Sequence, residues 1–127
     1  MPSRSAATFC AAVLAGCVFV AAFLVAGCGP DRAHESDAQL GLNAEQSAGR
    51  AIFNERCASC HHPYSSSSLH GPGLDKLYGK KYLPSGLPAN DRFVMQTIVN
   101  GRRMMPAMGN SLSDEQLHEL IAYLHTL

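Results

Sequence analysis

Two cysteines and a histidine stand close together in the segment CASCH, at positions 57 to 61. Cysteines three positions apart at the end of a helix face the same way, and the next residue can turn its imidazole toward that side. This is the attachment pattern of a c-type haem, in which the thiols add to two vinyl groups and the histidine binds the iron. The sequence therefore predicts one covalent haem c (iron), attached at Cys57 and Cys60, with His61 as the proximal axial ligand.

Other sites that use the same residue types fit less well. A structural zinc site needs four ligands, but Cys10, Cys17 and Cys28 all belong to the apolar N-terminal region. A thioredoxin-like CxxC belongs to a strand followed by a helix, a pattern that is absent here. A plain disulfide leaves the adjacent His61 unexplained.

Three methionines in RRMMPAMG, positions 102 to 109, are candidates for the second axial ligand. The arginines, proline and glycine of this segment indicate a surface loop, so its methionines are not ordinary core. A thioether prefers ferrous iron, so a His/Met pair has a higher reduction potential than two histidines. Pro106 favours an extended backbone at Met105, and neighbouring side chains of an extended chain point to opposite sides. Met104 and Met105 therefore cannot both bind one iron, and this geometry leaves open which of them does.

The remaining candidate ligands are weaker. Met108 lies beyond the proline, where Gly109 indicates that the chain is turning away. His70 is the only plausible distal rival among the histidines. The others are not expected to bind iron, since one adjoins the proximal histidine and two are expected to be solvated on the polar side of a helix: His62, His118 and His125.

Three helices are predicted to position these residues. The first runs from about Ala44 to Glu55 with Asn43 as its N-cap, and the second from about 91 to 100, between Asn90 and Gly101. The third follows a capping box formed by Ser113 and Gln116. The apolar spacing predicts these inward-facing residues: Ala48, Ala51, Ile52, Val94, Met95, Ile98, Leu117, Leu120, Ile121, Leu124 and Leu127.

The fold class is therefore all-α, because no strand pattern competes with these helices. About thirty residues rich in glycine and proline separate the first two helices, which is unusual within a domain of 84 residues (44–127). A core of this size is also marginally stable by itself. One large apolar cofactor, wrapped by the loops, explains both features.

The ordered features resemble the small class I cytochromes c. GRAIF precedes CASCH, and HGPGL, IVNGRRMMPAMG and LSDEQLHELIAYL follow it. The resemblance covers about residues 44 to 127. It implies a fold of three main helices with long loops around one haem.

The resemblance also implies roles for single residues. The first and last helices should cross where a glycine permits close approach and aromatic side chains fill the angle, in positions that match Gly49, Phe53, Leu120 and Tyr123. The methionine directly before a proline should be the sixth ligand, which selects Met105. The haem-pocket support would come from Pro106 and from the GPGL segment, where the carbonyl of Pro72 or its neighbour holds the His61 ring and Leu74 follows. The segment KKYLPSGLP, positions 80 to 88, matches no motif.

The N-terminus has the pattern of an export signal. Residues 5 to 27 carry no charge and follow Arg4, and the run ends in VAGC, which resembles a bacterial lipoprotein signal cleaved before a lipidated Cys28. A second box, LAGC at 14 to 17, is disfavoured because cleavage there would expose VFVAAFLV. The alternatives are an uncleaved membrane anchor and plain secretion. We therefore predict a signal peptide (1–27), a lipidated cysteine with a flexible tether (28–43) and a cytochrome domain (44–127), on the periplasmic side of a bacterial membrane.

The expected function is electron transfer between redox protein partners, by a monomer that is not an enzyme and has no small-molecule substrate. The net charge of +0 and the lack of a basic run exclude nucleic acid as a partner. Alternatives are a haem-based gas sensor, a peroxidase-like enzyme, and an electron-input subunit of a larger oxidoreductase. Five cations form either a positive rim that steers an acidic partner or an ordinary solvated surface: Lys76, Lys80, Lys81, Arg102 and Arg103.

Overall fold

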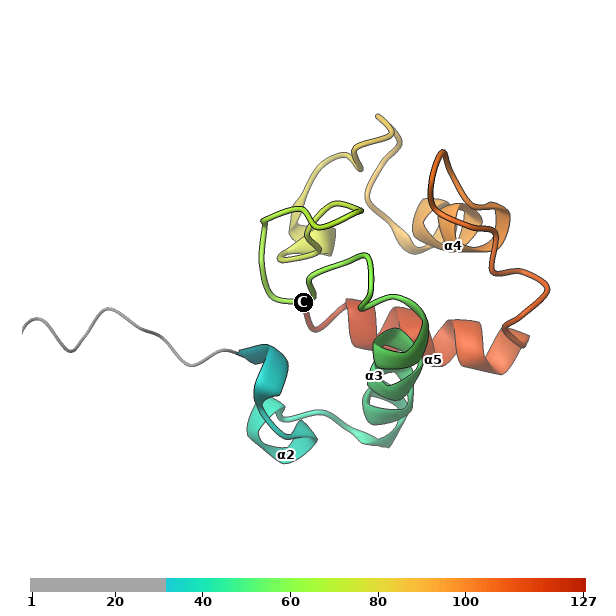
Figure 1. Cartoon of the computed structure of the whole chain (residues 1–127). Helices are drawn as coiled ribbons and strands as arrows, with labels where there is room; N and C mark the ends of the chain where they lie inside the picture. Colours follow the sequence, from blue (N-terminus) through green and yellow to red (C-terminus); the bar gives the residue numbers. More distant parts are fainter. Residues whose placement is uncertain (1–31) are drawn as a thin grey trace, which may run out of the picture. The chain divides into compact units, whose positions relative to one another are not determined.

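The computed structural model describes residues 32–127, so the predicted signal segment and Cys28 lie outside the described residues. The helices are α2 (Asp37–Leu40), α3 (Ala44–Arg56), α4 (Asp91–Asn100) and α5 (Asp114–Leu124), with 3-10 turns η1 (Arg32–His34) and η2 (Leu77–Gly79). Within 32–127 there is no strand, only two isolated β-bridges. Figure 1 shows α3 crossing α5, and a long irregular segment that leads from α3 to α4. The all-α fold class is confirmed.

The three main helices begin where their caps predict. Asn43, Asn90 and Ser113 have extended backbones, and each side chain accepts a hydrogen bond from the backbone N–H three residues later. Asn43 and Ser113 complete capping boxes with the glutamines at those positions. Gly101 ends α4 with φ 68°, a left-handed value that favours glycine.

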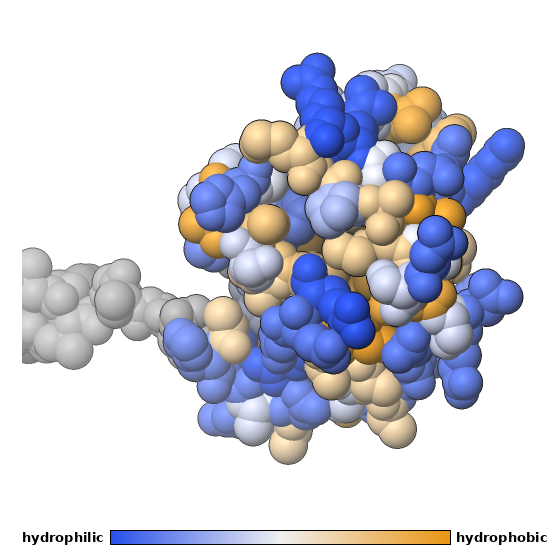
Figure 2. Space-filling view, turned by 45° about the vertical axis from the view of Figure 1, so that its right-hand side comes forward, coloured by the Kyte–Doolittle hydropathy of each residue, from blue (hydrophilic) through white to orange (hydrophobic). Residues whose placement is uncertain are grey.

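The crossing of α3 and α5 is the centre of the core. A Cβ atom at Gly49 would overlap the backbone carbonyl of Glu119, so only glycine allows this approach. Phe53, Leu120 and Tyr123 fill the angle and are almost fully buried, with the Phe53 and Tyr123 ring centroids 5.5 Å apart. Figure 2 shows polar residues over much of one face of the domain, with apolar residues between them. The crossing implied by the resemblance is therefore present.

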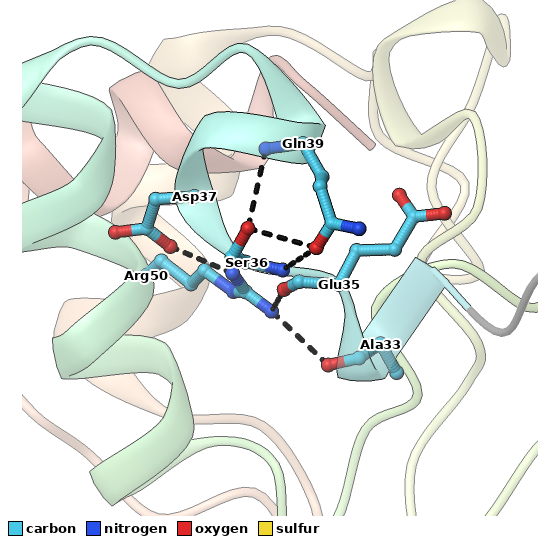
Figure 3. A network of polar contacts seen from close by, with 6 residues as sticks. All are labelled: Ala33, Glu35, Ser36, Asp37, Gln39 and Arg50. Atoms are coloured by element: carbon cyan, nitrogen blue, oxygen red, sulfur yellow. Dashed lines mark hydrogen bonds and ion pairs between the residues drawn. The ribbon is translucent and has the colours of Figure 1, made fainter.

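The expectation of a flexible tether is wrong for residues 32–43, which fold onto the side of α3. The guanidinium of Arg50 donates to Asp37 Oδ1 at 2.6 Å, to the Glu35 carbonyl at 2.7 Å and to the Ala33 carbonyl at 3.1 Å (Figure 3). Ser36 caps α2 through a capping box. We call residues 32–43 the N-terminal clasp.

The buried face of α3 differs from the predicted one at two residues. Ala51, expected to face inward, is exposed, whereas Arg50 is only 9% exposed. Side-chain hydrogen bonds to the Asp37 carboxylate, first from Arg50 and then from Ser47, hold its pKa below the usual value. Arg50 is buried because the clasp supplies three acceptors, a long-range arrangement that the polar sequence of this segment does not reveal.

Candidate functional site

An apolar cavity of about 450 Å³ lies among α3, α4, α5 and the connecting segments. Buried side chains from all of these elements border it: Phe53, Leu77, Leu83, Val94, Ile98, Leu120 and Leu124. A cavity of this volume is within the range of small-molecule sites. The loops between the helices therefore enclose a site for an apolar group.

The CASCH segment forms a tight turn at the end of α3. The backbone N–H groups of Cys60 and His61 both donate to the Cys57 carbonyl, at 3.0 and 2.9 Å. Cys57 and Cys60 are free cysteines and border the cavity. Burial raises the pKa of the Cys57 thiol to about 11, with a contribution from Cys60, so this thiol is neutral at physiological pH. The turn brings two unpaired thiols to one apolar space.

The His61 ring is held by a second segment of the chain. Its Nδ1 lies 2.8 Å from the Pro72 carbonyl, and since a carbonyl only accepts, Nδ1–H donates and Nε2 is the ring nitrogen left for an iron. A Cβ atom at Gly71 would overlap the imidazole, so the backbone lies directly against the ring. Leu74, which borders the cavity, is tied back by its N–H to the His62 carbonyl at 2.9 Å. The protein alone therefore holds the imidazole ring in a fixed orientation at the edge of the cavity.

The methionines of the 102–109 loop differ in burial. A tight turn joins Arg102 and Met105 through reciprocal backbone hydrogen bonds of 3.0 and 2.9 Å. Met104 is 83% exposed, whereas Met105 is half-buried and packs against the core. Met108 is also half-buried, and its Sδ lies 3.6 Å from the Ser111 hydroxyl that donates to it. All three methionines and Pro106 border the cavity. The exposed Met104 is less suited to fill it than the half-buried Met105 and Met108.

The other histidines take different positions. His70 is exposed and borders the cavity, and His118 is exposed as expected. His125 is also exposed, as expected, but makes two contacts that were not predicted: its ring stacks on Tyr78 with centroids 3.7 Å apart, and Nε2 lies 2.8 Å from Asp91 Oδ1. These contacts join the end of α5 to the start of α4.

Residues 80–88, which match no motif, form one wall of the cavity. Leu83 is buried, and Leu83, Pro84 and Ser85 border the cavity. The Leu83 N–H donates to the Leu87 carbonyl, and Gly86 closes the turn with φ 82°. The combination of an apolar residue with proline and glycine was the only signal of this role in the sequence.

Comparison with known proteins gives relatives for this domain. The family described as "Cytochrome C oxidase, cbb3-type, subunit III" matches residues 44–124. Cytochrome c6 of Leptolyngbya boryana is 33% identical over 86 residues, covering 64% of this chain and 91% of that protein. The chloroplastic cytochrome c6 of Chlamydomonas reinhardtii is 30% identical over 81 residues, which cover 64% of this chain and 53% of the relative.

Two further matches extend the range of relatives. The cbb3-type cytochrome c oxidase subunit FixP of Azorhizobium caulinodans is 37% identical over 83 residues, covering 62% of this chain but only 26% of that protein. Among solved structures, cytochrome c6 from the diatom Phaeodactylum tricornutum has a TM-score of 0.50 at 32% identity, over 62% of this chain and 88% of that one. The similarity is therefore to one domain, alone or within a longer protein.

Proposed function

Since the chain belongs to the cytochrome c family described as cbb3-type cytochrome c oxidase subunit III, it carries a covalent haem c and transfers electrons, and we propose which residues perform these tasks. Cys57 and Cys60 would attach the haem, and His61 would bind its iron. The observation that carries this assignment is the apolar cavity that both free thiols and the oriented imidazole border.

Met105 would supply the second protein ligand to the haem iron. It is the half-buried member of the adjacent methionine pair, and it packs against the core beside the cavity. Pro106 favours the extended backbone at Met105, and the turn to Arg102 fixes that backbone. Pro72 and Leu74 support the proximal side. The haem supplies the one-electron chemistry, while the chain orients it, excludes water and tunes its potential.

The attachment test compares the two cysteines of CASCH with a cysteine of the predicted signal segment. Cys57→Ser and Cys60→Ser should each lower the yield of holo-protein, because each removes one thioether. Acid–acetone extraction should leave the haem on the wild-type polypeptide. Cys17→Ser is the matched control and should retain full haem content. Release of the haem from the wild-type polypeptide would contradict the attachment.

We place the domain outside the cytoplasm, held at a membrane by lipid on Cys28. Support comes from the uncharged run followed by VAGC in the sequence. Among the described residues no helix is long and apolar enough to cross a membrane. The intact mass of the native protein should show acyl groups on a chain that begins at Cys28, and Cys28→Ser should accumulate precursor. A native chain that begins at Met1 without lipid would instead support an uncleaved anchor.

A second candidate function is that of an electron-input subunit. The family description and the FixP relative favour it, since both name a cbb3-type oxidase. Extraction in mild detergent should then yield the protein bound to an oxidoreductase. Recovery as a free monomer would favour an independent electron carrier.

A further inference from the structure

The N-terminal clasp is an addition to the cytochrome domain. The family match begins at Ala44, yet the clasp belongs to the same compact unit, Arg32–Leu127. Only three residues separate Arg32 from Cys28, the proposed site of the lipid. The clasp therefore decides from which point of the domain the chain continues toward Cys28.

Arg50 fastens the clasp to the middle of α3. Its buried guanidinium donates to one carboxylate and two backbone carbonyls of the clasp, which belong to Asp37, Glu35 and Ala33 (Figure 3). Hydrogen bonds with an ionised donor are about twice as strong as those between neutral groups. One side chain thus holds three points of the clasp.

The two ends of the clasp make contacts of their own. Arg32 Cζ lies 4.6 Å from the centroid of the Tyr64 ring, a cation–π contact. Leu42, near the other end, packs against the core. Since Tyr64 follows CASCH and Ala44 begins α3, the clasp runs back beside α3. The bound clasp moves the point at which the chain leaves the domain from the start of α3 to Tyr64.

The clasp also shortens the chain that joins the domain to the proposed lipid. With the clasp bound, the chain from Cys28 to Arg32 reaches at most about 14 Å. With the clasp released, the chain from Cys28 to Ala44 reaches up to about 55 Å. Effective concentration falls roughly as the −3/2 power of tether length, so a fourfold longer tether lowers it ~8-fold.

We infer that the clasp is a tether-shortening device, which directs electron transfer to a redox partner held in the same membrane. This inference rests on the proposed lipid at Cys28 and adds where the partner must be. A short tether keeps the domain at the membrane surface, where a partner in that membrane meets it at high effective concentration. Arg50 acts as a positioning residue, because it does not border the cavity.

The first test asks whether Arg50 keeps the clasp closed. A glutamate-specific protease cuts after Glu35, whose carbonyl accepts a hydrogen bond of 2.7 Å from Arg50. In the lipidated holo-protein, Arg50→Met should raise the rate of this cleavage ~10-fold or more, because local opening exposes the bond. Arg92→Met, the same change at an exposed arginine of α4, is the control and should leave the rate within about twofold. Equal cleavage of the wild type and Arg50→Met would overturn the inference.

The second test measures what the shorter tether does. Reduced holo-protein on phosphatidylcholine vesicles gives one electron to ferrocenium, which becomes ferrocene. The ferrocenium is either dissolved or carried on an alkyl chain in the same vesicles. Arg50→Met should lower the rate with the membrane-held probe by up to ~8-fold and keep the rate with the dissolved probe within about twofold. Arg92→Met should change neither rate.

A change within the clasp itself covers the case in which Arg50→Met does not fold. Asp37→Asn removes the charge of one acceptor and alters no residue of α3, so both rates should move in the same directions by less. Absence of lipid on Cys28 in the native protein would contradict the proposed placement. A lipidated protein whose rate with the membrane-held probe is the same in the wild type, Arg50→Met and Asp37→Asn would overturn the tether-shortening role alone.

Discussion

The two sides of the cavity are supported in different ways. On the histidine side, residues 57–74 are crosslinked by backbone hydrogen bonds, with Gly71 N–H donating to Cys60 and Leu74 N–H to His62. The ring of His61 is fixed by a carbonyl from another part of this segment. The methionine loop, residues 101–109, closes on itself through Arg102 and Met105 and is tied to the end of α4 only through Met108 and Gly109.

This difference predicts that the two sides have different tasks: the histidine side is needed to form the holo-protein, and the methionine side sets its reduction potential. The histidine side would carry the attachment thiols and an imidazole that Gly71 and Pro72 orient, so damage there should prevent formation of the holo-protein. The methionine side contributes a single soft ligand from an exposed loop. Damage there should leave the haem attached and change its potential and ligand binding.

The largest expected effect is on the histidine side. His61→Ala removes the imidazole that Pro72 orients, so the yield of holo-protein should fall strongly and the residual haem should lack the wild-type spectrum. Haem content per polypeptide is the measurement. His118→Ala, an exposed change on α5, should keep full haem content. Normal spectra in His61→Ala would contradict the assignment.

A smaller effect is expected from Met105→Ala. The haem should stay covalently attached, but the far-red sulfur-to-iron absorption band of the oxidised protein should disappear. The potential should drop by ~59 mV for each tenfold loss of preference for ferrous iron. Carbon monoxide should bind the reduced variant and leave the reduced wild type unchanged. Binding to the wild type would favour the gas-sensor function instead.

The sequence predicted the parts of the fold that depend on local signals. Helix starts follow from Asn43, Asn90 and Ser113, because a cap is a contact between residues three positions apart. The cavity-lining cysteines and His61 follow from one pentapeptide. The Gly49 crossing followed from resemblance, since the carbonyl of Glu119 that requires it is seventy residues away.

Contacts between distant segments were not predictable in this way. Arg50 was assigned no role because its acceptors lie in a polar segment that matched no pattern, outside the residues of the family match. The contacts of the exposed His125 were not predicted because its partners, Tyr78 and Asp91, come from two other elements. Such polar contacts are decided by tertiary structure, and hydrophobic periodicity does not report them.

Two glycines allow a matched comparison of the two sides. Gly71→Ala places a methyl group against the His61 ring, and Gly101→Ala places one against the Met105 backbone. Each should destabilise the holo-protein by about 1–3 kcal/mol, as overpacking does. Gly101→Ala should also weaken the sulfur-to-iron band, whereas Gly71→Ala should perturb the histidine side and retain that band. Denaturant unfolding and absorption spectra measure both effects, and identical spectra would contradict the division between the sides.

The smallest effect is expected from the other methionines of the loop. Met104→Leu should keep the sulfur-to-iron band and the potential, because the Met104 side chain is 83% exposed. Met108→Leu should also keep the band, with a modest loss of stability, since its half-buried sulfur accepts a hydrogen bond from Ser111. The three single variants form one series with a single readout, the far-red band. If the band survives in Met105→Ala and disappears in Met104→Leu or Met108→Leu, the sixth ligand is a different methionine and the haem assignment to CASCH stands.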